Sequence, residues 1–128
     1  MGPGDIYFNQ NKEEKRMNVS YEGIGYLAVT IPASTCTAGH VCRVNAAGLC
    51  EQCSSGDHFD GVTDAVENQR ATMQIQGCAE IRYSGTKPSA GRVKLSSDGK
   101  GGVKLDTNGK EYLIMQVKEE TTTIVVKL

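Results

Sequence analysis

The sequence predicts an all-β domain of about eight short strands, folded as a compact small barrel, a sandwich or a bent ribbon. Three observations favour this class. Apolar and polar residues alternate with a period of two along most of the chain after Tyr21. Candidate strands recur roughly every 8–12 residues, with turn residues between them. The composition of 15 Gly, no Trp, 5 Tyr and 2 Phe suits short strands better than helices.

The length of 128 residues gives room for one hydrophobic core, which excludes two-domain enzymes. We divide the chain into an extended N-terminal arm over residues 1–16 and a single β domain over residues 17–128. The arm is rich in glycine, asparagine and charged residues, so it cannot bury its own backbone. Its apolar anchor consists of Ile6, Tyr7 and Phe8.

The charges nearly cancel, with 14 Lys and Arg against 15 Asp and Glu and a pI near 6.1, which argues against a dedicated nucleic-acid binder. The lysines of residues 94–110 have no aromatic side chains among them on which bases could stack. Residues 1–84 carry 6 basic and 10 acidic side chains, whereas residues 85–128 carry 8 and 5. This asymmetry favours head-to-tail contacts between copies of the chain.

No segment has the character of a membrane span or an export signal. The longest mainly apolar stretch, residues 24–33, is about half of the roughly 20 residues that a membrane-spanning helix needs. The first twenty residues lack the apolar core of a signal peptide. We therefore expect a soluble protein made in the cytoplasm, without membrane contact.

Two segments alternate most clearly. Residues 72–83 predict one continuous half-buried strand, because apolar residues occupy every second position almost without interruption. Residues 25–31 predict a second strand, which ends at Pro32. In this strand we expect Leu27, Val29 and Ile31 to face inward.

Turn residues place the remaining strands. Residues 45–48 (Asn-Ala-Ala-Gly) predict a tight hairpin between strands at 41–44 and 49–53. Residues 60–70 fit a helical period only loosely, so we expect a strand that ends at the turn 67–70.

The C-terminal third adds two expected hairpins. Strands at 92–95 and 103–105 follow each other, and residues 107–110 (Thr-Asn-Gly-Lys) predict a hairpin turn after the second one. Strands at 112–117 and 122–128 flank a polar turn.

Cysteine is the most unusual component, with five residues in the chain. Cys50 and Cys53 could open a zinc site, since thiolate and imidazole suit tetrahedral Zn²⁺. However, residues three apart on a strand face opposite sides, which separates these two sulfurs. Inert thiols are the preferred interpretation, with a disulfide or a zinc site as alternatives. The candidate metal ligands are Cys36, His40, Cys42, Cys50 and Cys53.

The hairpin register matters for the same question. With Val44 opposite Leu49, Arg43 would face Cys50 and Cys42 would face Glu51. In that register Cys42 and Cys50 do not lie against each other.

A polar cluster over residues 54–61 contains the only arrangement that resembles catalytic chemistry. Cys53 and His58 could be drawn as nucleophile and base, with Asp57 and Asp60 nearby. No oxyanion motif, phosphate loop or HExxH supports this, and such clusters are ordinary in β-turns. We therefore expect no enzyme activity.

Two segments carry a resemblance to a known family. The first is a "GD.F.GV" turn, and the second is a strand whose pattern continues into "YSG..P..G". Their matching residues are Gly56, Asp57, Phe59, Gly61 and Val62 in the first, and Ile75, Gly77, Glu80, Tyr83, Ser84, Gly85, Pro88 and Gly91 in the second. Over about residues 21–128 the chain resembles small head-associated proteins encoded beside the major capsid gene of tailed bacteriophages and prophages. It departs from their pattern in its cysteines and in the N-terminal arm.

The resemblance implies a capsid decoration or cement protein, similar in role to the lambdoid head decoration protein. Such a protein would have a β-clip-like or small-barrel body. It would bind major capsid protein on the exterior of the expanded head at threefold or quasi-threefold points, as a homotrimer or another homo-oligomer. It would belong to the virion after synthesis in the host bacterial cytoplasm, and no cofactor is implied. We expect Ile6, Tyr7 and Phe8 to anchor the arm on the capsid by adding a strand to a sheet edge. The alternative is a zinc-stabilised β-rich binding or adaptor module.

Overall fold

The computed structural model describes residues 25–128, so the arm predicted for residues 1–16, with Ile6, Tyr7 and Phe8, lies outside the described residues. The described part contains strands and turns, which confirms the all-β class. No helix in it is long and apolar enough to cross a membrane. Its strands are β1 (Leu27–Pro32), β2 (Val41–Val44), β3 (Cys50–Gln52), β4 (Gly61–Glu67), β5 (Arg70–Gln76), β6 (Cys78–Arg82), β7 (Gly91–Ser97), β8 (Val103–Leu105), β9 (Lys110–Lys118) and β10 (Thr123–Lys127).

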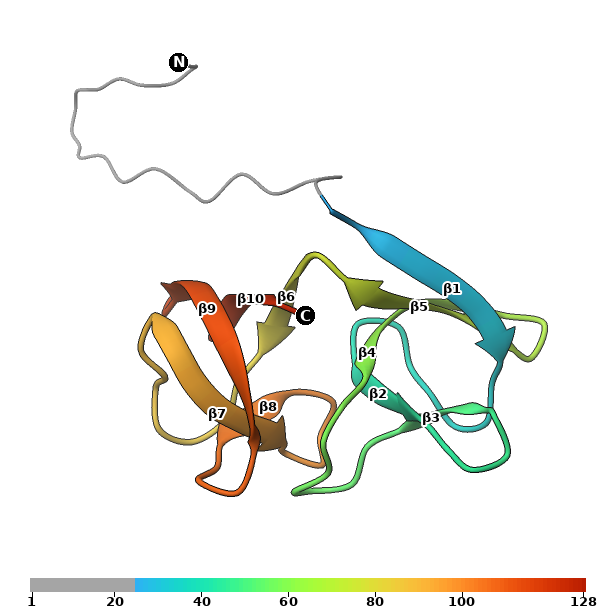
Figure 1. Cartoon of the computed structure of the whole chain (residues 1–128), viewed down its shortest axis with the longest axis horizontal. Helices are drawn as coiled ribbons and strands as arrows, with labels where there is room; N and C mark the ends of the chain where they lie inside the picture. Colours follow the sequence, from blue (N-terminus) through green and yellow to red (C-terminus); the bar gives the residue numbers. More distant parts are fainter. Residues whose placement is uncertain (1–24) are drawn as a thin grey trace, which may run out of the picture.

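The strands of the described residues form two five-stranded antiparallel sheets that lie side by side (Figure 1). The expectation of about eight strands was too low, because ten strands form between residues 27 and 127. The expectation of a closed small barrel was also wrong. Each sheet is built from one half of the chain, and no strand of one sheet pairs with a strand of the other within residues 25–128.

The first half of the chain forms a sheet in the order β1-β5-β4-β2-β3. This sheet curls, because the segment after β1 returns to the opposite edge strand, β3. There the Ser34 N–H donates to the Cys50 carbonyl at 2.8 Å, and the Gln52 N–H donates to the Thr35 carbonyl at 2.6 Å. The curl brings Ala33 into a parallel bridge with Cys50.

The second half repeats this topology strand for strand, in the order β6-β10-β9-β7-β8. Its curl closes in the same way. The Ser84 N–H donates to the Val103 carbonyl at 2.9 Å, and Tyr83 forms a parallel bridge with Val103. The chain is therefore an internal structural duplication, and β1 to β5 correspond in order to β6 to β10.

The side chains inside the two curled sheets correspond as well. Four fully buried residues of the first half have fully buried counterparts at the same sequence interval: Cys42 with Leu95, Cys50 with Val103, Ala71 with Ile124 and Met73 with Val126. Each half also has a bulge at a matching place, after Thr63 in β4 and opposite Val125 in β9. The same small framework is thus filled with Cys, Ala and Met in the first half and with Leu, Val and Ile in the second half.

A shared core joins the two halves. It extends from the second half to Val41, Cys53, Phe59 and Val62 of the first half. Phe59 stacks on Tyr112 with 4.6 Å between ring centroids and 5° between ring planes. The Tyr112 hydroxyl donates to the Phe59 carbonyl at 3.1 Å, so the buried phenol is satisfied. We expect the halves to unfold together, because this core belongs to both.

The long strand predicted for residues 72–83 is in fact two strands. Gly77 has a φ of 94°, and there the chain leaves β5 in the first sheet and begins β6 in the second. A Cβ at Gly77 would lie 3.0 Å from the Gly25 carbonyl oxygen, so glycine also permits the close approach of that segment. Met73 on one side and Ile81 on the other are buried as predicted.

The strand predicted at residues 25–31 is present as β1, but its predicted orientation is only partly right. Ile31 packs on the small core of the first half. Leu27 and Val29 are 46% and 36% exposed, and the expectation that they face inward was wrong. They lie on the sheet face that bears the core, but beyond the part of it that other residues cover.

Two turns confirm the predictions in detail. The turn at residues 45–48 is held by Asn45, whose N–H donates to the Leu49 carbonyl at 3.0 Å. The strand predicted for 60–70 is β4, and its turn into β5 has positive φ at both Asn68 (53°) and Gln69 (63°), as a type I′ hairpin requires. The helical alternative for this segment was wrong.

Two connections differ from the expected pairing. The first hairpin has Val44 opposite Cys50, one residue away from the expected register. The turn at 107–110 forms, yet it is not a hairpin turn, because β8 and β9 pair with opposite edges of β7. Leu95 accordingly pairs with Leu105 on one side and Lys110 on the other. The last expected hairpin is present as β9 and β10.

Candidate functional site

Three of the candidate metal ligands lie together in the first half. Cys42 and Cys50 are fully buried, and Cys36 packs against them from the segment that closes the curl. Thr63 is their polar neighbour, with its Oγ1 3.8 Å from the Cys50 Sγ. Burial raises the pKa of Cys36 to about 11, and burial raises the pKa of Cys42 further. The thiols of Cys36 and Cys42 are therefore protonated at neutral pH.

The other two candidate ligands lie elsewhere. Cys53 points into the shared core while Cys50 points into the small core, which confirms that strand alternation separates the Cys50 and Cys53 sulfurs. The ring of His40 covers Gly101, and its Nδ1 lies 3.3 Å from the Gln52 Oε1. Over residues 25–128, no group of three or more His, Cys, Asp or Glu side chains is arranged to hold a metal ion. The five cysteines, all within this range, are unpaired.

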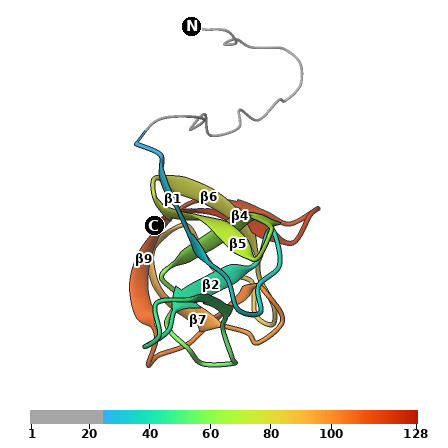
Figure 2. The same cartoon turned by 90° about the vertical axis from the view of Figure 1, so that its right-hand side faces the viewer.

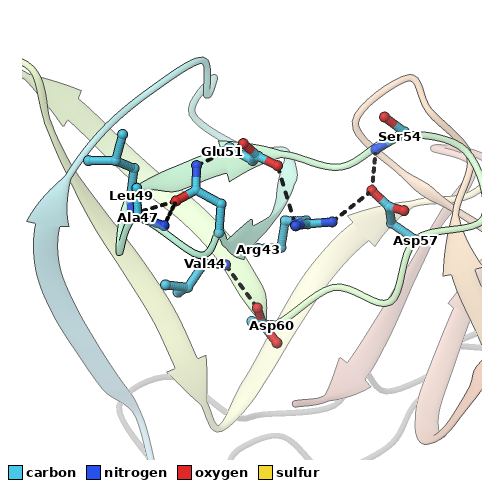
Figure 3. Close-up of polar contacts among 9 residues, drawn as sticks. Arg43, Val44, Ala47, Leu49, Glu51, Ser54, Asp57 and Asp60 are labelled. Atoms are coloured by element: carbon cyan, nitrogen blue, oxygen red, sulfur yellow. Dashed lines mark hydrogen bonds and ion pairs between the residues drawn. The ribbon is translucent and has the colours of Figure 1, made fainter.

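The polar cluster of residues 54–60 stabilises its own turns (Figure 3). The Ser54 N–H donates to the Asp57 carboxylate at 2.9 Å, and the Val44 N–H donates to the Asp60 carboxylate at 2.9 Å. Arg43 connects the hairpin to this loop, because its Nη1 lies 3.6 Å from the Asp57 Oδ2 and its Nε lies 3.3 Å from a Glu51 oxygen. Both predicted carboxylates thus have structural partners.

The structure gives Cys53 and His58 different surroundings. Burial, followed by the nearby Asp57 carboxylate, raises the pKa of Cys53 to about 12. His58 is exposed, and its Nε2 lies 3.2 Å from the carbonyl oxygen of Asn108. A nucleophilic thiol needs a lowered pKa and a base in contact, and Cys53 has a raised one.

A polar cleft of about 400 Å³ lies where the two halves meet. The first half contributes the segment 38–40, and the second half contributes the other lining residues, Glu80, Arg82, Gly101 and Thr123. Glu80 accepts hydrogen bonds from the Thr123 hydroxyl at 2.7 Å and from the Lys118 ammonium at 3.1 Å. The Thr123 hydroxyl, and then Lys118, hold the pKa of Glu80 below its usual value against the opposing effect of burial.

The clearest accessible apolar surface is the edge formed by β1. Three large apolar side chains around its start are exposed: Tyr26 (48%), Leu27 (46%) and Val29 (36%). The Tyr26 hydroxyl donates to the Asp64 carboxylate, so its ring lies across β5. Within residues 25–128, β1 pairs with β5 alone, and its second edge has no strand partner. The remaining exposed apolar side chains occur singly on β2, β4, β8 and β9.

The sequence reasoning missed this surface and the duplication that explains it. A signal for the duplication is present, because Ala38-Gly39-His40-Val41 and Ala90-Gly91-Arg92-Val93 share a pattern before β2 and within β7. Ile31 and Ser34 likewise recur as Ile81 and Ser84. Comparison with known proteins adds no identity: no family model, no curated protein and no solved structure matches the chain.

Proposed function

We propose that the chain is a non-catalytic structural protein of a phage virion that binds the outer surface of the capsid and stabilises the head. Its partner would be the major capsid protein, and its assembled form a homotrimer. The two curled sheets would constitute the β-clip-like body expected of such a protein. The proposal extends the sequence resemblance to head decoration proteins of tailed bacteriophages.

One observation carries the proposal: the residues that match the head-protein pattern are the framework of this fold. Phe59 stacks in the shared core, and Tyr83 and Pro88 are buried. Gly61 allows β4 to approach β5, because a Cβ there would lie 2.2 Å from the Gln74 carbonyl oxygen. A pattern made of such residues specifies a shape, so a chain that shares it is expected to share the shape.

The use of polar groups also supports a binding role. The carboxylates of the loop at 54–60 hold turns, and the thiols of Cys42, Cys50 and Cys53 are buried. Among residues 25–128, β1 presents an apolar edge without a strand partner, which is suited to contacts between neighbouring copies on the capsid. Many copies of such a body on a lattice convert weak individual contacts into stable attachment.

Cosedimentation with expanded heads tests this function. The full chain should bind heads of the phage that encodes it in a saturable way, and deletion of residues 1–16 should reduce the bound amount. A finer variant replaces Ile6, Tyr7 and Phe8 with Ser, and its control replaces Glu13 and Glu14 with Gln. Undiminished binding of the Ser variant would disprove the role of the apolar anchor, and absence of binding by the full chain would disprove the function.

A further inference from the structure

The duplication allows the surroundings of β1 and β6 to be compared directly, because these strands are equivalent. In the second half, the first half covers part of the side that β6 forms. The side chain of Gln74 donates to the Cys78 carbonyl at 2.9 Å, and the Val41 N–H donates to the Gly101 carbonyl at 2.9 Å. The first half thus covers this side of the second half with the outer face of its own sheet.

The equivalent side of the first half has no such cover among residues 25–128. Val29 is the counterpart of Ala79, since both precede the matched Ile31 and Ile81 by two positions. Ala79 is 6% exposed, whereas Val29 is 36% exposed. β1 lies on the outer side of the first half, away from the second half (Figures 1 and 2). Among residues 25–128, the first half therefore exposes a surface whose counterpart on the second half is covered by the first half.

The complementary surface is open as well. Val41 and Gln74 belong to the face of the first half that covers β6, and both are buried. The counterpart of Val41 in the second half is Lys94, and the counterpart of Gln74 is Lys127. Both lysines are exposed. Within residues 25–128, the first half thus has one uncovered surface of the first kind and the second half has one of the complementary kind.

The charges of the two ends are opposite. Residues 25–77 carry two basic and five acidic side chains, whereas residues 78–128 carry nine and six. A surface with Lys94 and Lys127 is therefore attracted to the first half of another copy. An unpaired strand edge with apolar neighbours is the usual site for such an addition.

We propose that the β1 edge, with Leu27 and Val29, is an interface between copies of this chain. It receives the face of a second copy that bears Lys94 and Lys127, and so repeats between chains the contact that the two halves make within one chain. This interface is heterologous, because each copy uses a different surface on each side. Successive contacts of this kind close into a ring or continue as a line.

Sedimentation of the purified full chain, without heads, tests this proposal independently of capsid binding. The chain should self-associate reversibly, and association should weaken as salt is raised. Val29→Lys and, separately, Lys127→Glu should each weaken the association constant about tenfold or more. Val44→Lys and Lys100→Glu are the matched controls, because Val44 is exposed on β2 and Lys100 is exposed in the turn between β7 and β8, and both variants should associate like the parent.

Mixing the two defective variants decides the geometry. The Val29→Lys chain keeps its lysine face and the Lys127→Glu chain keeps its β1 edge, so an equimolar mixture should form a dimer that neither variant forms alone. An interface formed by the β1 edges of both copies predicts no such rescue. Absence of a dimer in the mixture would therefore overturn the proposal. A parent that stays monomeric, or a folded Val29→Lys chain that associates as the parent does, would also overturn it. Circular dichroism verifies that each variant is folded.

Discussion

Ser34 and Ser84 make the same hydrogen bond at the same place in the two halves of the chain. The Ser34 N–H donates to the Cys50 carbonyl at 2.8 Å, and the Ser84 N–H donates to the Val103 carbonyl at 2.9 Å. Each bond draws the segment after the first strand of a half onto the third strand, and so curls the sheet. The two acceptor residues, Cys50 and Val103, also have equivalent buried side chains. The backbone hydrogen bonds and the core packing therefore show the same duplication.

The inner core of the second half should be more sensitive to truncation than its surface. Leu95→Ala removes a fully buried side chain, and we expect the free energy of unfolding to fall by roughly 2–5 kcal/mol. Leu105 pairs with Leu95 across the two strands but is exposed, so Leu105→Ala should change the free energy of unfolding by no more than about 0.5 kcal/mol. Urea denaturation followed by fluorescence or circular dichroism measures both. Equal effects of the two substitutions would contradict the assigned core.

The contact between Gly101 and His40 joins the two halves and should be intolerant of a methyl group. Gly101 has a φ of 94°, and a Cβ there would lie 2.5 Å from the His40 Cγ. Gly48→Ala, at φ 81° with open space around it, should cost only the backbone strain of about 1–2 kcal/mol. Gly101→Ala should lower the free energy of unfolding by more than Gly48→Ala does. Adding His40→Ala to the Gly101→Ala chain should recover part of this extra loss. A double-mutant cycle with a coupling energy near zero would refute this contact.

Thiol reactivity should separate the cysteines by their burial. In the folded protein at pH 8, Cys42, Cys50 and Cys53 should resist Ellman's reagent, because they are buried and burial raises the pKa of Cys53 to about 12. The partly exposed Cys78 should react first, Cys36 should follow more slowly because burial raises its pKa to about 11, and all five thiols should react after unfolding. Peptide mapping after a short alkylation identifies the labelled residues. Rapid labelling of Cys53 would show that the shared core opens easily.

Stability should fall in acid partly through Glu80. The pKa of this residue is held below its usual value by the Thr123 hydroxyl and by Lys118. A carboxyl whose pKa is lower in the folded state stabilises the fold above its unfolded pKa of about 4.3, and this contribution is lost as pH falls through the folded pKa. Glu80→Gln should therefore flatten the decline of stability below about pH 4.3, and Thr123→Val should do so partly. Parallel pH profiles for parent and Glu80→Gln would exclude this role.

Removal of metal should leave the fold unchanged. Cys36, Cys42 and Cys50 share one small core, but His40 and Cys53 point elsewhere, so the first half is filled by packing. We expect the same melting temperature with and without a strong chelator, and no stoichiometric zinc in purified protein by mass spectrometry of metals. A loss of folding on chelation would instead support a zinc-stabilised module.

The sequence was most informative where a single strand or turn decides the outcome. Alternation identified β4, and the turn residues at 45–48 and 67–70 marked two hairpins. Alternation could not locate the break at Gly77, because β5 and β6 both continue the same period of two. It also could not show whether a face is covered, which is why Leu27 and Val29 were assigned to the interior.

Pairing between distant strands was beyond the reach of local patterns. The turn at 107–110 has good hairpin residues, yet β7 lies between the strands that it joins. At the candidate site, strand geometry correctly separated Cys50 from Cys53. The meeting of Cys36 with Cys42 and Cys50 depends on the curl of the sheet, which no spacing of cysteines reveals.

Imaging of the head is the most direct test of the proposed role. Electron cryomicroscopy of expanded heads, with and without the purified chain, should show added density on the outer surface at threefold points, of a size that fits three copies of the duplicated body. Heads whose outer surface is the same with and without saturating chain would contradict the account.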